Sequence, residues 1–338
     1  MATYQEIKHK YYIDHKEAHT FFEQLHSQTG GELLNDNKIL KINNAIGKVQ
    51  FHRFIHFDQI RLITQRCHLN ETVSVEHIPS EIQKDYLFFV LHKSGTVHHL
   101  FKNDETISVY GKDSQQGVVI TNFMSSLINI GEEGLPSEWA TMVVKKSFII
   151  DLLEDVPEGF VDFILSDKHW LLFEPVNFAI SQSLNEIFSN EDDFAFNNFK
   201  IYGRAIDLVG ELLKHMSNRN FEDISNLTPQ DAKRMFEVKD YICRDLSITP
   251  SLEEICKEFG LSRSKLIRDF KTEFGVPVYK FFNKMRMQLA RELLVEKQYS
   301  VTEVSQHLGF KGLSKFSDAF KKFYNISPKS MIEQHKIK

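Results

Sequence analysis

The spacing of apolar residues divides the chain into a strand-like front part and a helical back part. From about Lys38 to Phe148, short apolar stretches alternate with turn signals such as Lys93-Ser94-Gly95. The predicted strands cover residues 49–57, 86–92, 106–110 and 118–123. Several short strands at regular spacing predict a small β-sandwich or barrel, whereas the apolar residues after Trp170 recur at helical spacing. The pattern therefore predicts an α+β protein in which the strands come first.

Two helices are predicted after the strand-rich part, over residues 175–188 and 197–216. One face of the second carries an apolar stripe made of Ile201, Ala205, Leu208, Val209, Leu212 and Leu213. This stripe can pack on the sheet of its own chain or against a second copy, and the sequence leaves both options open. The segment 217–230 that follows (SNRNFEDISNLTPQ) is polar, and we expect an interdomain linker there.

A helix-turn-helix pattern first occurs at residues 251–274. Ser251 and Glu254 have the spacing of a capping box, and Gly260 can end the first helix in the left-handed region. Two short helices joined by a glycine turn form the geometry that places the second helix in the DNA major groove. The residues predicted to contact DNA from this unit are Ser262, Arg263, Ser264, Lys265, Arg268 and Lys271.

The same layout recurs at residues 300–324, where GFKGLSKFSDAF repeats the pattern of GLSRSKLIRDF in the first unit. The predicted contact residues here are Lys311, Ser314, Lys315, Ser317, Asp318, Lys321 and Lys322. Most of the intervening segment 277–298 should form one helix of about 27 Å, at 1.5 Å per residue. This length is close to one DNA turn of roughly 34 Å, so the two second helices can enter successive major-groove segments.

Charge is distributed unevenly along the chain. From Pro229 to the end there are 21 Lys and Arg against 14 Asp and Glu, whereas the preceding residues contain 20 against 32. The formal net charge of −5 is therefore the sum of +7 on the back part and −12 on the front part. A basic domain attached to an acidic one indicates a polyanion-binding module joined to a module of another function.

The cysteines and the hydropathy exclude several other classes. Cys67, Cys243 and Cys256 form no C-x-x-C pair, so neither a zinc site nor a redox motif is predicted, and a reducing cytoplasm is expected. No apolar stretch approaches about 18 residues, and the start of the chain has no signal-peptide core, so no membrane association is expected.

Residues 238–333 resemble the AraC/XylS family of bacterial transcription regulators. The resemblance is most specific over 300–328, where V-x-E-V-x-x-x-L-G-F is followed by S-x-F-S-x-A-F-K-K-x-Y-x-I-S-P. The spacer positions Arg286-Met287, Ala290-Arg291 and Leu293-Leu294 also match. The front half is similar, less specifically, to the siderophore-responsive branch, through residues 202–216 and 265–270.

The resemblance implies four segments and a set of partners. The segments are a cupin-like sensor domain (1–168), a helical dimerisation segment (169–217), a linker (218–230) and a tandem helix-turn-helix domain (231–338). The implied partners are double-stranded DNA, RNA polymerase, a small-molecule effector and a second copy of the chain, and no cofactor is implied. The family reads bases with positions that correspond here to Ser264, Arg268, Ser314 and Asp318.

Asp318 departs from the family pattern, in which an Arg often occupies this position. Phosphate repels a carboxylate, although a carboxylate can accept from a cytosine amine. We therefore expect the first unit to supply most of the sequence discrimination. The second unit should mainly hold phosphates through Lys315, Ser317, Lys321 and Lys322.

The sequence gives weaker indications about the front half. Arg61, Arg66 and His92 are candidates for an anionic effector if they point inward, although surface positions are the alternative. Many histidines are present, but no H-x-H with a following Glu occurs, and the adjacent His98 and His99 would point to opposite faces of a strand. No metal site is therefore predicted.

Two functional alternatives remain beside a ligand-responsive regulator that is not an enzyme. One is a cupin-type metal enzyme with a DNA-binding tail, for which neither a metal triad nor a nucleophile–base pair is found in the sequence. The other is a constitutive regulator whose front half only dimerises. A DNA-repair alkyl acceptor would need a Pro before its reactive cysteine, and Cys67 follows Gln65-Arg66 instead.

Overall fold

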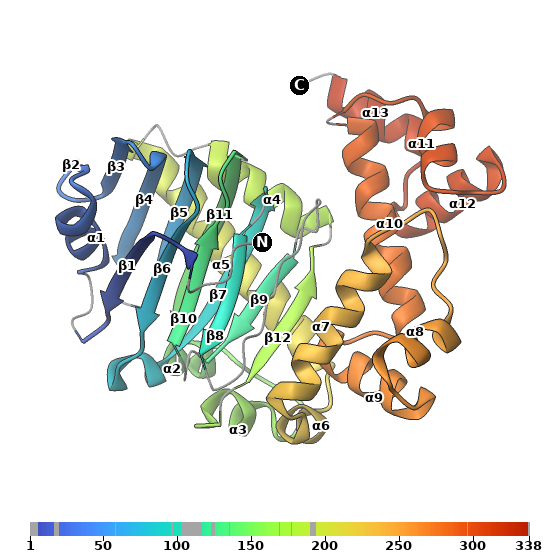
Figure 1. The fold of residues 1–338 in the computed structure, drawn as a ribbon, viewed down its shortest axis with the longest axis horizontal. Coiled ribbons are helices and arrows are strands. Elements are labelled where there is room, and N and C mark those ends of the chain that lie inside the picture. The colour runs from blue at the N-terminus through green and yellow to red at the C-terminus, as the bar shows by residue number, and fades with distance from the viewer. Residues whose placement is uncertain are drawn as a thin grey trace.

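The structure is a computed structural model that describes residues 6–16, 20–57, 59–95, 97–102, 117–122, 126–134, 136–168, 170–176, 178–189, 194–295 and 297–336. These residues form a strand-rich front half and a helical back half, as the apolar pattern predicted (Figure 1). The predicted strand at 106–110 lies outside the described residues. No helix in the described ranges is long and apolar enough to cross a bilayer.

Two sheets form the front half. The larger has the strand order β12 (Leu171–Pro175), β9 (Gly117–Thr121), β7 (Tyr86–Ser94), β11 (Pro136–Lys145), β5 (Ile60–Leu69), β4 (Gly47–Phe57), β3 (Ile39–Asn44) and β2 (Glu32–Leu34). The smaller has the order β1 (His9–Asp14), β6 (Val73–Ile78), β10 (Ser126–Gly131) and β8 (Val97–Lys102). Both sheets contribute to one apolar core, to which β6 gives Val73 and β5 gives Cys67 and Leu69.

The opposite face of the larger sheet is covered by helices (Figure 1). Strand β7 shows how the alternation works, because Phe88 and Val90 face the smaller sheet whereas Leu87, Phe89 and Leu91 face the helices. These helices are α2 (Lys146–Asp151), α3 (Phe160–Leu165), α4 (Phe178–Ser189) and α5 (Phe194–Ser217). A further helix, α1 (Phe21–Thr29), lies beside β1, and the 3₁₀ helix η2 (Glu81–Asp85) precedes β7. The α5 stripe packs inward with α4 in the core on this face of the sheet, so its own chain covers it.

The boundaries around the predicted linker differ from the expectation. Strand β12 lies within the segment predicted to be helical, because its five residues pair with β9. The predicted linker contains helix α6 (Phe221–Asn226) and the start of α7 (Pro229–Cys243). The Asn220 side chain accepts from the backbone N–H groups of Glu222 and Asp223, and Thr228 caps α7 directly before a proline at the first helical position. The polar residues of this segment, which suggested a loop, instead act as helix caps.

The back half consists of α7 and six further helices in the described residues. They are α8 (Leu252–Phe259), α9 (Arg263–Phe274), α10 (Val278–Val295), α11 (Val301–His307), α12 (Leu313–Tyr324) and α13 (Pro328–Lys336). The helices α7, α9 and α10 lie next to the edge strand β12 of the larger sheet, and α11–α13 lie farther along α10 (Figure 1).

Candidate nucleic-acid interface

The helices α8 and α9 form the first helix pair at the predicted position. Ser251 caps α8 by accepting from Glu254 N, and Gly260 ends the helix with a φ of 61°. Ser262 caps α9 by accepting from Lys265 N at 3.2 Å. The predicted ladder Leu266, Phe270 and Phe274 is fully buried, which fixes the rotation of α9 about its axis. Its opposite face is therefore exposed.

The exposed face of α9 carries the predicted contact residues Ser262, Arg263, Ser264, Arg268 and Lys271. Arg263 pairs with Glu253 of α8 at 2.8 Å, but both side chains are mostly exposed, so this pair adds little stability. Lys265 is the one predicted contact residue of this unit that is not on the exposed face, because two-thirds of its side chain is covered.

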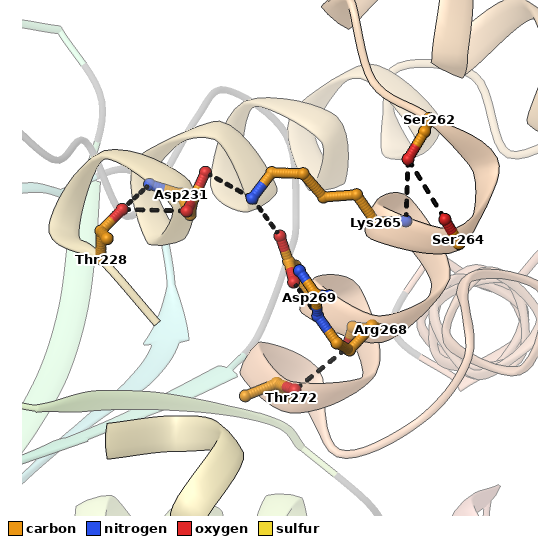
Figure 2. Close-up of polar contacts among 8 residues, drawn as sticks. All are labelled: Thr228, Asp231, Ser262, Ser264, Lys265, Arg268, Asp269 and Thr272. Carbon is orange, nitrogen blue, oxygen red and sulfur yellow. Dashed lines mark hydrogen bonds and ion pairs between the residues drawn. The ribbon is translucent and has the colours of Figure 1, made fainter. Parts of the chain in front are cut away.

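Acidic partners hold two of the α9 cations in place (Figure 2). The Lys265 ammonium lies 2.9 Å from Asp231 of α7 and 2.9 Å from the buried Asp269. The other oxygen of Asp269 lies 2.9 Å from Arg268 Nε, whereas 61% of the Arg268 side chain is exposed. Arg268 is thus anchored at its Nε and projects the rest of its guanidinium outward.

The contacts in this network shift the pKa values of Lys265 and Asp231. Hydrogen bonds to Asp269 and Asp231 raise the pKa of Lys265 above its usual value. Burial alone would raise the pKa of Asp231, but hydrogen bonds from Lys265 and Thr228 lower it below its usual value. Lys265 and Asp231 therefore stay ionised at neutral pH, and their pair ties α9 to α7.

The helices α11 and α12 form the second pair. Ser300 and Glu303 make a complete capping box at the start of α11, and Gly309 adopts a φ of 64° in the turn. Phe316 and Phe320 of α12 are fully buried, and Phe323 is partly buried. Arg286 of α10 donates through Nε to Leu308 O at 2.9 Å, and its guanidinium lies 3.8 Å from the Phe310 ring centroid. The spacer helix thereby holds the turn of the second pair.

The exposed face of α12 differs electrostatically from that of α9. Lys311, Ser314, Lys315, Asp318, Lys321 and Lys322 are exposed, and Ser317 is half-buried. Among the described residues, none of these four lysines has an ion pair, whereas Arg263 and Arg268 each have one and Lys265 has two. Within the described part of the chain, the α12 surface therefore presents lysines with no carboxylate at ion-pair distance.

The three effector candidates of the front half do not come together. Arg61 and His92 both lie on the face toward the smaller sheet. Val143 of β11 pairs with Arg61 of β5 on one side and with Phe88 of β7 on the other, so Arg61 lies level with Phe88. His92 is four residues farther along β7. At roughly 3.3 Å per residue the separation is about 13 Å. Arg61 stacks on Tyr86, with its guanidinium 5.1 Å from the ring centroid. Arg66 faces the other side of the sheet, where it donates to Glu138 and to Phe188 O of α4.

A cavity of about 60 Å³ lies between the two sheets. Its walls are mainly apolar and include Phe51, Val75 and Trp139, with Thr29, Gln65, His77 and Asn129 as polar residues. The Asn129 amide and His77 Nε2 are 3.2 Å apart. No group of three or more metal-ligating side chains is present in the described ranges.

Comparisons with known proteins agree with the geometry of the back half. Residues 255–334 match a helix-turn-helix domain family. The xylose operon regulatory protein of Escherichia coli K12 is 30% identical over 112 residues, which are 33% of this chain and 28% of that protein. The transcriptional activator RhaS of E. coli O157:H7 is 32% identical over 184 residues, which cover 46% of this chain and 65% of RhaS.

A solved structure, the C-terminal domain of the response regulator AraT from Geobacillus stearothermophilus, is 27% identical. The match covers 32% of this chain and 88% of that domain, with a TM-score of 0.29. The chain thus matches only part of the length of the two curated regulators. Residues 255–334 therefore form a helix-turn-helix domain that is similar to those of the AraC/XylS transcriptional regulators, as the sequence resemblance predicted.

The acidic residues that brace α9 were not among the residues predicted from the sequence. Asp269 follows Lys265 by four residues, which is the spacing of an ion pair on one helix face, so a signal was present. Asp231 is far from Lys265 in the chain, and only the packing of α7 against α9 brings them together.

Proposed function

We propose that this chain is a sequence-specific regulator of transcription that holds double-stranded DNA with both helix pairs. The observation that carries the proposal is the contrast between the braced cations of α9 and the unpaired lysines of α12. A guanidinium fixed at Nε keeps its Nη donors in a defined direction, as a bidentate bond to guanine O6 and N7 requires. Flexible lysines without carboxylate partners suit phosphates, which carry no sequence information.

The first helix pair is accordingly the base reader, with Ser264 and Arg268 facing the groove and Ser262, Arg263, Lys265 and Lys271 supporting or flanking them. In the second pair, Lys311, Lys315, Lys321 and Lys322 hold phosphates together with Ser317, while Ser314 and Asp318 face the bases. The 18 residues of α10 span about 27 Å, which is compatible with entry into successive major-groove segments.

The regulatory part of the proposal concerns the front half. A small-molecule effector would occupy the cavity between the sheets, whose apolar walls and paired His77 and Asn129 suit a mainly apolar compound with one hydrogen-bonding group. Effector pockets usually measure about 300–1,000 Å³, so a cavity of 60 Å³ must widen on binding. This small size favours, as the second candidate, a constitutive regulator whose front half only dimerises.

A second copy of the chain would pack on α5. The inward stripe is already covered, but Phe199 and Ile206 on another face are 81% and 45% exposed. Gly203 and Gly210 share this face, and an added Cβ at either would meet nothing within 4 Å. Positions 199, 203, 206 and 210 follow the spacing of a helix–helix seam. The regulator would act on cytoplasmic DNA and contact RNA polymerase there.

The proposal is tested by binding selection from random duplexes, with Arg268→Ala and Asp318→Ala compared in the full chain. We expect Arg268→Ala to relax preference at one or two base positions, at a cost of about 1–3 kcal/mol, and Asp318→Ala to change preference less. Equal relaxation would refute the division of roles. A wild-type affinity that does not fall with salt would refute DNA binding itself. Native mass spectrometry would report the oligomeric state and any retained effector.

A further inference from the structure

The edge strand β12 of the larger sheet inserts a side chain into the core of the DNA-binding domain. Phe173 is fully buried, although its strand belongs to the front half. Its ring centroid lies 6.3 Å from that of Phe236 in α7, 5.7 Å from Phe274 in α9 and 6.1 Å from Phe281 in α10. The Lys239 ammonium of α7 lies 5.4 Å from the same ring. The core that positions α9 is therefore completed by the front half.

Arg219 connects the same elements through hydrogen bonds. This residue follows α5 and is only 8% exposed. Its Nη1 donates to the carbonyl oxygens of Glu273 at 2.6 Å and Thr272 at 3.3 Å, which belong to the last turn of α9. Its Nη2 donates to Phe173 O at 2.7 Å and also pairs with the Glu174 carboxylate. One guanidinium thus binds β12 on one side and the C-terminal end of α9 on the other.

The charge of Arg219 is compensated inside the junction. Glu174 is buried, and its second oxygen lies 3.5 Å from His215 Nδ1 of α5. A cation at the C-terminal end of α9 also suits the negative end of the helix dipole. Gly275 leaves room for this cation, because a Cβ there would lie 3.3 Å from Arg219 Nε.

Helix α12 is held differently from α9. Tyr324, the last residue of α12, donates through its hydroxyl to Met287 O of α10 at 3.2 Å. Arg286 of the same helix secures the α11–α12 turn. The described contacts that fix α12 therefore come from the DNA-binding domain, whereas those that fix α9 come partly from the sheet of the front half.

We propose that Phe173 and Arg219 form an interdomain lock through which β12 sets the position of α9 but not that of α12. Strand β12 is hydrogen-bonded to β9, and β9 to β7, so a change in the sheet reaches α9 through main-chain pairing. The front half then controls one helix pair and leaves the other in place. The lock goes beyond the proposed function, since it rests on contacts within the chain.

The lock is tested in the full chain by hydrogen exchange with mass spectrometry, without DNA. The variant is Arg219→Met with Glu174→Gln, which removes both members of the buried pair together. We expect amide exchange in residues 263–274 to become at least tenfold faster, while exchange in 313–324 stays within twofold of the wild type. Unchanged exchange in 263–274, or equal acceleration in both helices, would overturn the lock.

A matched control is Arg286→Met, which removes a buried arginine of the DNA-binding domain that lies away from the contacts of Arg219. It should accelerate exchange in 313–324 and spare 263–274. If the double variant does not fold, Phe173→Leu replaces it, because this change keeps every charge and shortens one buried side chain. Phe173→Leu should accelerate exchange in 263–274 selectively, and the absence of that effect would overturn the lock. Because no DNA is used, failure of the lock is distinguishable from failure of DNA binding.

Discussion

The buried carboxylate of Asp269 lies 2.9 Å from Nε of Arg268, its neighbour in the chain. The other oxygen of this carboxylate lies 2.9 Å from the ammonium of Lys265, one turn earlier in the helix. A single acidic side chain thus orients the arginine that we assign to base reading and ties its helix to the rest of the domain. This relationship makes Asp269 a positioning residue for DNA recognition.

Replacement of Asp269 should therefore affect selectivity more than affinity. In Asp269→Asn the Arg268 guanidinium loses its charged anchor, so preference at the base that it reads should fall by roughly 1 kcal/mol or more. Non-specific affinity should stay equal or rise slightly, because one negative charge near DNA is removed. Binding to a selected site and to a scrambled duplex measures both effects. Asp318→Asn is the control, and an equal loss of selectivity there would contradict the prediction.

The unpaired lysines of α12 should appear in the salt dependence of binding. Each phosphate contact contributes about 0.9 to the slope of log affinity against log salt, so Lys321→Gln with Lys322→Gln should reduce the slope by up to about 1.8. The loss of affinity should be similar for all sequences, since phosphates are common to all of them. Titrations at four salt concentrations measure this. Lys168→Gln, an exposed lysine of the front half, should leave the slope unchanged.

The glycines of the two turns should differ in their tolerance of alanine. Gly260 and Gly309 both have positive φ, of 61° and 64°, so alanine is strained by about 1–2 kcal/mol at either. A Cβ at Gly260 meets nothing within 4 Å, whereas at Gly309 it would lie 2.3 Å from Ser247 O. Gly309→Ala should thus lower the free energy of unfolding by roughly 2 kcal/mol more than Gly260→Ala. Chemical denaturation of the two variants compares them, and equal losses would refute the contact with Ser247.

The junction should make stability depend on pH through Glu273. Burial raises the pKa of Glu273 to about 8, against the opposing charge of Arg219, whereas its usual value is 4.5. The folded protein therefore favours the protonated acid, so stability from this group is complete below about pH 4.5 and is lost as the pH rises toward 8.

Glu273→Gln, which imitates the protonated acid, should gain stability over the wild type between pH 5 and pH 8. The gain should be on the order of 2 kcal/mol at the upper end. Denaturant midpoints at the two pH values measure it, and an equal difference at both would contradict the assignment. Glu174 acts in the opposite sense, because burial is outweighed by Arg219 and its pKa falls to about 2. Its contribution is lost only as the pH falls from about 4.5 toward 2.

The exposed face of α5 should determine the oligomeric state. Ile206→Glu places a charge in the middle of the proposed seam, so a dimer should become a monomer at micromolar concentration. Sedimentation velocity detects the change. Leu165→Glu is the matched control, because Leu165 is similarly exposed at 51% but belongs to α3 and not to the proposed seam. A dimer that persists in Ile206→Glu would exclude this face as the interface.

The sequence by itself determined the two helix pairs, because their signals are local. Capping serines, left-handed glycines and apolar ladders of i, i+4 spacing depend only on nearby residues, and Ser262, Gly260 and Phe270 all act as predicted. The exposed residues of α9 and α12 follow from the same ladders, because a buried face defines the opposite one. The strand-rich character of the front half was also readable from its alternation and turns.

Only the tertiary structure decided what connects the two halves. Strand β12 looked like the beginning of a helical region, and its identity depends on pairing with β9, about 50 residues earlier. The neighbours of Arg219 are Phe173, Glu174 and Glu273, which are 45 to 54 residues away in the chain. The brace on Lys265 likewise needs Asp231 of another helix. Such contacts are set by how elements pack rather than by local periodicity, so the sequence identified the two helix pairs and the fold decided what holds each of them.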